Sequence, residues 1–286
     1  MRRLLIALVA GAAASLAFAA PAAFAAEDAE HPEEHAYSFE GPFGTYDRAQ
    51  LQRGFLVYKQ VCASCHGLEH MSYRNLGEPG GPFEAYSVTN HETGAEEIVL
   101  NPDGHGHAKP VDVNENPFVR ALAAEVMIPT IDTETGLADE REGRVSDRFR
   151  TPFANEYVAR AANGGALPPD LSVINSARHG GAEYIRSLLL GYTGAQQSGK
   201  YINHYFPGGL IAMPPPLVAD DQVVYEDGTP ATIEQMSTDV SAFLQWAADP
   251  HMEARKKTGF MAVTFLLILS LLLYVAYKTV WRGQSH

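Results

Sequence analysis

The feature that most constrains the fold of this chain is a stretch of 19 residues without a charged side chain, 259–277, near its C-terminal end. The stretch is rich in Leu, Val, Ile and Phe, and its length is close to the ~20 residues that an α-helix needs to cross ~30 Å of hydrocarbon. Basic residues stand on both sides of it, so their count does not indicate an orientation. We therefore predict one transmembrane helix within a C-terminal anchor over 255–286.

The N-terminal end predicts export. Arg2 and Arg3 precede an apolar run that reaches Phe18, and the small-residue pattern Ala23-Phe24-Ala25 precedes acidic residues. This order is typical of a signal peptide, here 1–26, although an uncleaved anchor has a similar composition. Together with the C-terminal helix, it predicts an exported body over 27–254 and a short cytoplasmic tail.

The charge balance argues against one class of partner. The chain has 21 Lys and Arg against 34 Asp and Glu, a formal charge of −13, so it lacks the basic excess of a nucleic-acid-binding protein. The body retains 14 basic and all 34 acidic residues, which leaves a net charge of −20. Such a surface attracts basic proteins, although acidic residues also keep an exported protein soluble. The acidic residues that we consider first for binding a basic protein follow the loop at Met213 in the sequence: Asp220, Asp221, Glu226 and Asp227.

Helical periodicity dominates the body. Start and stop signals predict helices over 47–61, 117–128, 152–162 and 181–190, and another from 233 to the stop at Pro250. Asn116 is the predicted N-cap of the second helix and Pro129 its stop, Thr151-Pro152 starts the third, and Thr232 caps the last. The first begins after a possible N-cap at Thr45, and its apolar stripe of Leu51, Phe55 and Tyr58 leads to Cys62. No comparable run alternates with a period of two, and the segments 77–114 and 130–150 read as surface loops. We therefore predict an all-α fold with long loop insertions.

The only two cysteines lie in the motif Cys62-Ala63-Ser64-Cys65-His66. C-x-x-C-H is the attachment pattern of a c-type haem, in which both thiols add to vinyl groups and the histidine ligates the iron. A redox pair and half of a zinc site also use C-x-x-C. A zinc ribbon needs a second ligand pair, and a redox pair normally opens a helix, whereas these cysteines end one. The motif thus predicts one haem c bound through Cys62 and Cys65, with His66 as a ligand.

Met213 is the candidate for the opposite face of the iron, which decides between electron transfer and catalysis. Met71 lies too close to His66 along the chain to reach that face, and the methionines at 127 and 236 fall on apolar helical faces typical of a core. Met213 precedes three prolines, whose fixed φ holds the thioether in place at low entropic cost. A rigid loop with a buried methionine is the plainer alternative.

Seven strings in the chain resemble the cytochrome c1 family and occur in family order. They are YSFEGPFGTYD at 37–47, VCASCH at 61–66, GALPPDLS at 165–172, ARHGG at 177–181, YFPG at 205–208, MPPP at 213–216 and DGTPAT at 227–232. Few family strings occur over 77–150, and an extra cysteine pair of some relatives is missing.

The resemblance implies a c-type cytochrome fold and a role as the haem subunit of a bacterial cytochrome bc1 complex, anchored in the inner membrane with the haem domain in the periplasm. It implies electron transfer from the Rieske iron-sulfur protein to a soluble cytochrome c, with cytochrome b beside the anchor and no catalytic site of its own. By the same resemblance His66 and Met213 are the axial ligands and Arg178 pairs with a haem propionate. Asn163 and Tyr184 match positions near the propionates, although a capping residue and a helix-face tyrosine explain them equally well.

Two alternatives use the same haem motif. A membrane-tethered cytochrome c could serve an oxidase or a photosynthetic reaction centre, but the Arg178 and Met213 strings argue against it. A haem peroxidase needs an open or displaceable iron position and, in bacterial cases, usually a second haem motif. The single C-x-x-C-H motif counts against it.

Overall fold

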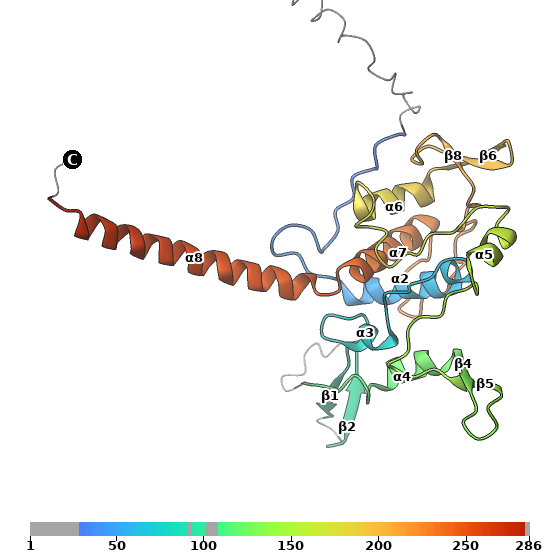
Figure 1. Ribbon diagram of the computed structural model, residues 1–286, viewed down its shortest axis with the longest axis horizontal. Helices are drawn as coiled ribbons and strands as arrows, with labels where there is room; N and C mark the ends of the chain where they lie inside the picture. Colours follow the sequence, from blue (N-terminus) through green and yellow to red (C-terminus); the bar gives the residue numbers. More distant parts are fainter. Residues whose placement is uncertain (1–28, 91–92, 101–107, 284–286) are drawn as a thin grey trace, which may run out of the picture.

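The computed structural model describes residues 29–90, 93–100 and 108–283, and the predicted signal peptide lies outside these ranges. The helices α2 (Arg48–Gln60) and α7 (Ile233–Ala248) lie against each other at the centre of the body, and α6 (Gly181–Leu190) also packs on α7 (Figure 1). α2 lies near the N-terminal end of the body and α7 near its C-terminal end, so their contact joins the two ends of the body.

Local capping explains where α2 and α7 begin. The Asp47 side chain accepts hydrogen bonds from the backbone N–H groups of Ala49 and Gln50, so Asp47 and not Thr45 is the N-cap of α2. Thr232 caps α7 as predicted, and its hydroxyl accepts a bond from Gln235 N–H at 3.1 Å. Side chains that end in oxygen thus satisfy backbone donors that the helix itself leaves unpaired.

Apolar and aromatic side chains fill the contact between α2 and α7. Phe55 of α2 meets Phe243 of α7 edge to face, with ring centroids 5.6 Å apart, and Tyr58 lies 5.8 Å from the same ring. A Cβ atom on Gly54 would lie 2.0 Å from the carbonyl oxygen of Asp239, so only glycine allows the helices to approach so closely. The predicted stripe of Leu51, Phe55 and Tyr58 is buried and therefore confirmed.

The shorter helices follow the predictions in part. α6 has its predicted bounds, and α4 (Pro117–Ala124) begins after its predicted cap, Asn116. It ends earlier than predicted because the chain turns into a strand at Met127. α5 (Glu156–Ala162) begins after Asn155 rather than at Thr151-Pro152. The one-turn helix α3 (Tyr73–Gly77) has no counterpart among the predictions.

The prediction of an all-α fold is wrong, because 37% of the described residues are helical and 14% are in strands, which form three small antiparallel sheets in this part of the chain. Each sheet is formed by short strands that are neighbours along the chain. The first has the order β2 (Glu96–Val99), β1 (Tyr86–Thr89), β3 (Lys109–Pro110); the second pairs β4 (Met127–Ile131) with β5 (Ala138–Glu142); the third has the order β6 (Tyr192–Gln197), β7 (Lys200–Asn203), β8 (Leu210–Ile211).

The strands show little period-two patterning because most of them bury neither face. Four of the five residues of β5 are exposed, and Pro129, which predicted the end of a helix, pairs with Glu140 inside the β4–β5 hairpin. Turn residues hold these pairings instead. Ser198 and Gly199 adopt positive φ between Gln197 and Lys200, as a two-residue hairpin turn requires.

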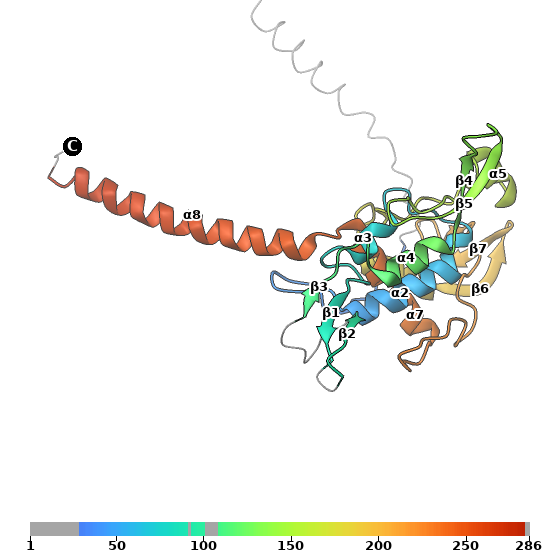
Figure 2. The same cartoon turned by 90° about the horizontal axis from the view of Figure 1, so that it is seen from below.

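α8 (Met252–Val280) projects from the body, separated from α7 by only three residues, 249–251 (Figure 2). It contains the whole uncharged stretch, and its apolar side chains are exposed along its length. Among the described residues it is the one helix long and apolar enough to cross a membrane.

Asp147 holds the base of the β4–β5 hairpin through a contact that is sensitive to acid. Its carboxylate accepts hydrogen bonds from the Arg141 guanidinium at 2.6 and 2.8 Å and from Arg144 N–H at 2.7 Å. The bonds from Arg141 lower the pKa of Asp147 from 3.8 to about 2. Because this pKa is lower in the folded than in the unfolded chain, the contact stabilises the hairpin fully above pH ~4 and is lost as the pH falls through about 2.

We predict that amide hydrogen exchange in the hairpin, corrected for intrinsic rates, accelerates as the pH falls from about 4 to about 2. Asp147→Asn should exchange fast already at neutral pH and show no further acid transition. Asp139→Asn, an exposed position on β5, is the matched control and should behave like the unmodified chain. An acid transition that persists in Asp147→Asn would contradict the assignment.

Candidate functional site

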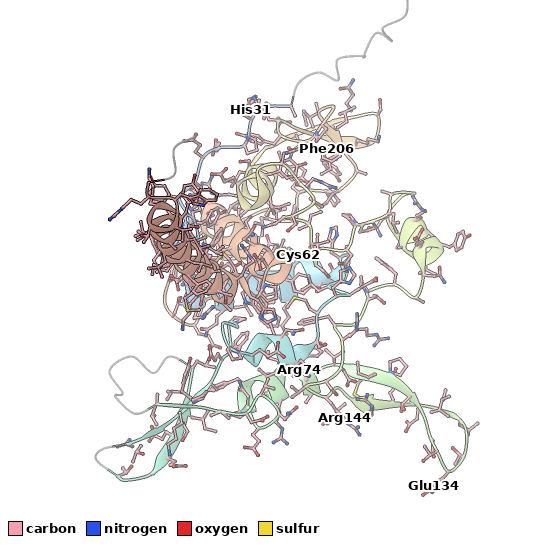
Figure 3. The ribbon with its side chains drawn as sticks, turned by 60° about the vertical axis from the view of Figure 1, so that its left-hand side comes forward. His31, Cys62, Arg74, Glu134, Arg144 and Phe206 are labelled. Atoms are coloured by element: carbon pink, nitrogen blue, oxygen red, sulfur yellow. The ribbon has the colours of Figure 1, made fainter. Side chains whose placement is uncertain are left out.

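The peptide Cys62–His66 follows directly from the last turn of α2 and folds back on itself. Val61 is the C-cap of α2, and the next three residues form a single 3₁₀ turn. The carbonyl of Cys62 accepts backbone hydrogen bonds from Cys65 at 3.1 Å and from His66 at 2.9 Å. Both thiols are free and half-buried, and the turn lies in the middle of the body, as Figure 3 shows for Cys62.

The environment of Cys62 favours the thiol form. Burial, and to a smaller extent Cys65, raises the pKa of the Cys62 thiol to about 12. Redox-active and zinc-binding cysteines depend on the thiolate, which a raised pKa disfavours. Within the described ranges, moreover, no group of three His, Cys, Asp or Glu side chains lies in a position to form a metal site. The second half of a cysteine-based zinc site is therefore not found there.

His66 is held so that one ring nitrogen is engaged and the other is left for a ligand bond. Its Nδ1 lies 2.7 Å from the carbonyl oxygen of Pro169, so Nδ1–H donates this bond and Nε2 carries the lone pair. Burial lowers the pKa of His66, which favours the neutral imidazole that metals bind. The Tyr58 hydroxyl donates to the His66 carbonyl at 3.1 Å and ties the peptide back to α2.

The segment that carries Pro169 is fixed beside the peptide by Asp170. One carboxylate oxygen of Asp170 accepts a bond from Glu69 N–H at 2.8 Å, and the other accepts one from Ser172 N–H at 2.9 Å. Leu171 N–H also donates to the Gly67 carbonyl at 2.9 Å. Neither Pro169 nor Asp170 is among the predicted site residues, because partners about a hundred residues apart leave no local pattern.

Met213 lies in a loop that leaves the third sheet at β8. Its side chain is half-buried, and its carbonyl accepts a hydrogen bond from the Tyr192 hydroxyl of β6 at 3.1 Å. Two of the other methionines, Met71 and Met236, are buried in the core. Met127 was expected in the core of a helix, but it lies on β4 and is 40% exposed. Packing in the core therefore accounts for Met71 and Met236 but not for Met127 or Met213.

The structure brings two of the three proposed propionate-binding residues together. The Arg178 guanidinium lies beside the Tyr184 hydroxyl of α6; burial raises the pKa of Tyr184, and Arg178 opposes that shift. Arg178 itself is exposed. Asn163 is the C-cap of α5, as its capping interpretation predicts, and its amide donates to the Ala159 carbonyl at 2.7 Å. One amide proton of Asn163 is left for another partner.

Comparison with known proteins shows which family the chain resembles over most of its length. The model of the Cytochrome C1 family matches residues 37–284. Cytochrome c1 of Rhodospirillum rubrum is 39% identical over 271 residues, which cover 87% of each chain. The mitochondrial cytochrome c1, heme protein, of Saccharomyces cerevisiae is 42% identical over 92% of this chain and 76% of its own length.

A longer relative has the same level of similarity. Cytochrome b/c1 of Bradyrhizobium diazoefficiens is 42% identical over 284 residues, and the match covers 91% of this chain but only 37% of that protein. The resemblance found in the sequence strings thus extends over nearly the whole chain at a level of identity that establishes kinship. The chain belongs to the cytochrome c1 family.

Proposed function

We propose that this chain is the haem-carrying electron-transfer subunit of a cytochrome bc1 complex, which takes electrons from the Rieske iron-sulfur protein and passes them to a soluble cytochrome c. Family membership supports the assignment. The observation that carries it is the Cys62–His66 turn, which folds back on itself and holds two thiols and an imidazole with a free Nε2 within five residues. No catalytic site of its own is proposed for the chain.

The residues present fit one haem c by the chemistry of their donors. When bound, the haem supplies a one-electron Fe(III)/Fe(II) couple. Cys62 and Cys65 would hold it covalently, and His66 and Met213 would supply the nitrogen and sulfur ligands of its iron. Pro169 orients the imidazole, and the Tyr192 bond and the three prolines restrain the Met213 loop. These contacts limit the rearrangement of the protein when the charge on the iron changes.

Arg178 is proposed to pair with a haem propionate. A partly buried carboxylate needs a charged partner, and a guanidinium can hold both of its oxygens. The contact with Tyr184 supports this role because it places a hydroxyl donor beside the guanidinium. Asn163, with its free amide proton, is proposed to lie near the propionates as well.

The placement in the membrane follows from the two ends. We propose that the signal peptide 1–26 directs export, that the body over 27–254 lies in the periplasm of a bacterium, and that 255–286 forms the anchor and a short cytoplasmic tail. α8 supports the anchor by its length and exposed apolar surface. Lipid and cytochrome b are the proposed neighbours of this helix, and nucleic acid is not a proposed partner.

A difference spectrum tests the proposal. Membranes that contain the complex are reduced with a quinol, with and without an inhibitor of the quinol site, and compared with the oxidised state. We expect the spectrum of low-spin haem c to develop with quinol and to be suppressed by the inhibitor. Reduction that ignores the inhibitor would favour a tethered cytochrome of an oxidase or reaction centre. A high-spin spectrum that changes on addition of peroxide would favour a peroxidase.

The acidic body predicts a strong effect of salt on electron transfer to a basic cytochrome c. Screening lengths fall from ~30 Å at 0.01 M to ~8 Å at 0.15 M salt, and steering raises association rates by roughly 10- to 1,000-fold. We therefore expect the second-order rate constant, measured by stopped flow, to fall at least about tenfold over this range. A flat profile would reduce the acidic residues to a role in solubility.

The acidic residues that follow Met213 differ in how free they are to attract a basic cytochrome c. Asp227 pairs with Arg53 at 2.7 Å, and Asp220 accepts a bond from Ile233 N–H at 2.8 Å, so both have structural roles. Glu226 is exposed and is the better position at which to change charge without disturbing the fold. Glu226→Gln should lower the slope of the salt profile while leaving the haem spectrum unchanged.

A further inference from the structure

A tight turn with an exposed phenylalanine at its tip lies beside the first turns of α8. The turn comprises residues 40–44, close to the N-terminal end of the described body, and both views place it next to the base of α8 (Figures 1 and 2). Phe43 is 75% exposed, which is unusual for so large an apolar side chain. Neither the site nor the proposed electron transfer uses it.

The base of this turn is firmly held. Phe39 is buried and stacks on Tyr37, with ring centroids 4.8 Å apart, and it also contacts Tyr46 at 5.4 Å. Backbone bonds from Glu40 N–H to the Tyr37 carbonyl and from Thr45 N–H to the carbonyl of residue 38 close the turn. The exposure of Phe43 therefore results from a defined conformation of the chain.

Contacts with α8 fix the height of the turn along that helix. The Lys256 ammonium donates to the carbonyl oxygens of Phe39 at 2.6 Å and Gly44 at 3.1 Å. The Glu253 carboxylate accepts a bond from Tyr46 N–H at 2.8 Å. Both partners lie in the first turns of α8, so the turn and the helix move as one unit.

Phe43 reaches the level at which the uncharged stretch begins. Its ring meets that of Phe260 at 5.7 Å and 65°, and Phe260 is the second residue of the stretch. Phe260 is itself 59% exposed, so the two rings form a continuous apolar surface on the outside of the helix. Aromatic side chains at this depth occupy the boundary between headgroups and acyl chains.

We propose that the tip of the turn, Pro42 and Phe43, inserts into the lipid interface on the periplasmic side of the inner membrane and gives the body a second lipid contact beside α8. The inference rests on the proposed membrane placement of α8. A lipid partner is favoured because the ring continues the exposed apolar surface of a membrane-spanning helix. Lys257, an exposed cation three residues before Phe260, can pair with lipid phosphate groups. The two contacts together would hold the body at a defined orientation over the bilayer.

Photolabelling of the intact complex tests this inference. The complex is reconstituted in vesicles of phosphatidylcholine that carries a diazirine on the first carbons of an acyl chain, and labelled peptides are identified by mass spectrometry. We expect lipid adducts on the peptide that contains Phe43 and on α8, and none on α5. The helix α5 lies on the side of the body away from α8 (Figure 1), and its Tyr157 is 85% exposed, so its peptide is the internal control for exposure alone.

Variants sharpen the test. Phe43→Asp should reduce labelling of the turn roughly tenfold or more, because a carboxylate is expelled from the hydrocarbon boundary, while labelling of α8 stays unchanged. Phe43→Leu should retain the label, and Tyr157→Asp should change neither peptide. Since Phe43 is exposed, these substitutions leave the buried core intact.

The outcomes separate the inference from the proposal on which it rests. Label on α8 without label on the turn would overturn the second contact and leave the membrane placement standing. A turn that takes no lipid label but, with a photoreactive amino acid in place of Phe43, cross-links to another polypeptide of the complex would overturn it in favour of a protein partner. Absence of label from both segments would overturn the membrane placement and the inference with it.

Discussion

Met213→Leu should leave the haem covalently attached, open one face of its iron to carbon monoxide and lower its reduction potential. The thioether favours Fe(II), and leucine offers no donor atom in its place. Axial ligation sets haem potentials over a range of ~0.8 V, so we expect a fall on the order of 0.2 V. At ~59 mV per tenfold change for one electron, this lowers the equilibrium constant for reduction of the haem by about three powers of ten. Redox titration and the carbon monoxide difference spectrum measure the two effects.

A second methionine provides the control for this experiment. Met127→Leu changes an exposed residue of β4 and should leave both the potential and the carbon monoxide spectrum unaltered. Met213→Leu with an unchanged spectrum would remove Met213 from the iron. Loss of covalent haem in that variant would instead show that the loop is needed for attachment.

Asp239→Ala should strongly destabilise the contact between α2 and α7. Asp239 is fully buried on α7 and accepts hydrogen bonds from Arg53 at 2.9 Å and Gln235 at 2.9 Å. The Arg53 side chain is only 15% exposed, so truncating Asp239 leaves a charge that is mostly out of water. Breaking a buried pair in this way costs about 3–5 kcal/mol, a large part of the roughly 5–15 kcal/mol that stabilises a typical domain. Urea unfolding followed by circular dichroism measures the loss.

An exposed ion pair supplies the comparison. Arg74 and Glu78 lie four residues apart at 2.8 Å, and the Arg74 side chain is 54% exposed, so Arg74→Ala should cost no more than about 0.5 kcal/mol. Replacing Asp239 and Arg53 together with apolar residues should recover most of the loss, because no charge is then left buried. A small effect of Asp239→Ala would show that Arg53 finds enough of a partner in Asp227.

The sequence predicted features whose cause is local. The bounds of α6, the Asn116 cap of α4 and the apolar stripe of α2 depend on residues a few positions apart, and each is found in the structure. The Cys62–His66 motif is local for the same reason, because its spacing alone brings both thiols into one turn. These patterns are readable because one helix turn or one cap contains all of their partners.

Features that depend on distant partners were missed. The Pro169 carbonyl that orients His66 and the Tyr192 hydroxyl that bonds the Met213 loop have no signature in either segment alone. The strands were missed because they are short and because β2, β3, β5 and β6 are exposed on both faces over most of their length, so burial leaves little alternation to detect. The prediction that Pro129 ends a helix was wrong, because proline also occurs in a short hairpin strand such as β4.

The most direct test of the account is whether the purified chain keeps iron porphyrin after extraction with acid and acetone, assayed by the pyridine haemochrome spectrum and by intact mass. We predict one covalently bound haem per chain, with none retained in a variant that carries Cys62→Ser and Cys65→Ser together. A chain that gives up all of its porphyrin to the solvent, or that carries none when isolated from membranes, would contradict the central claim.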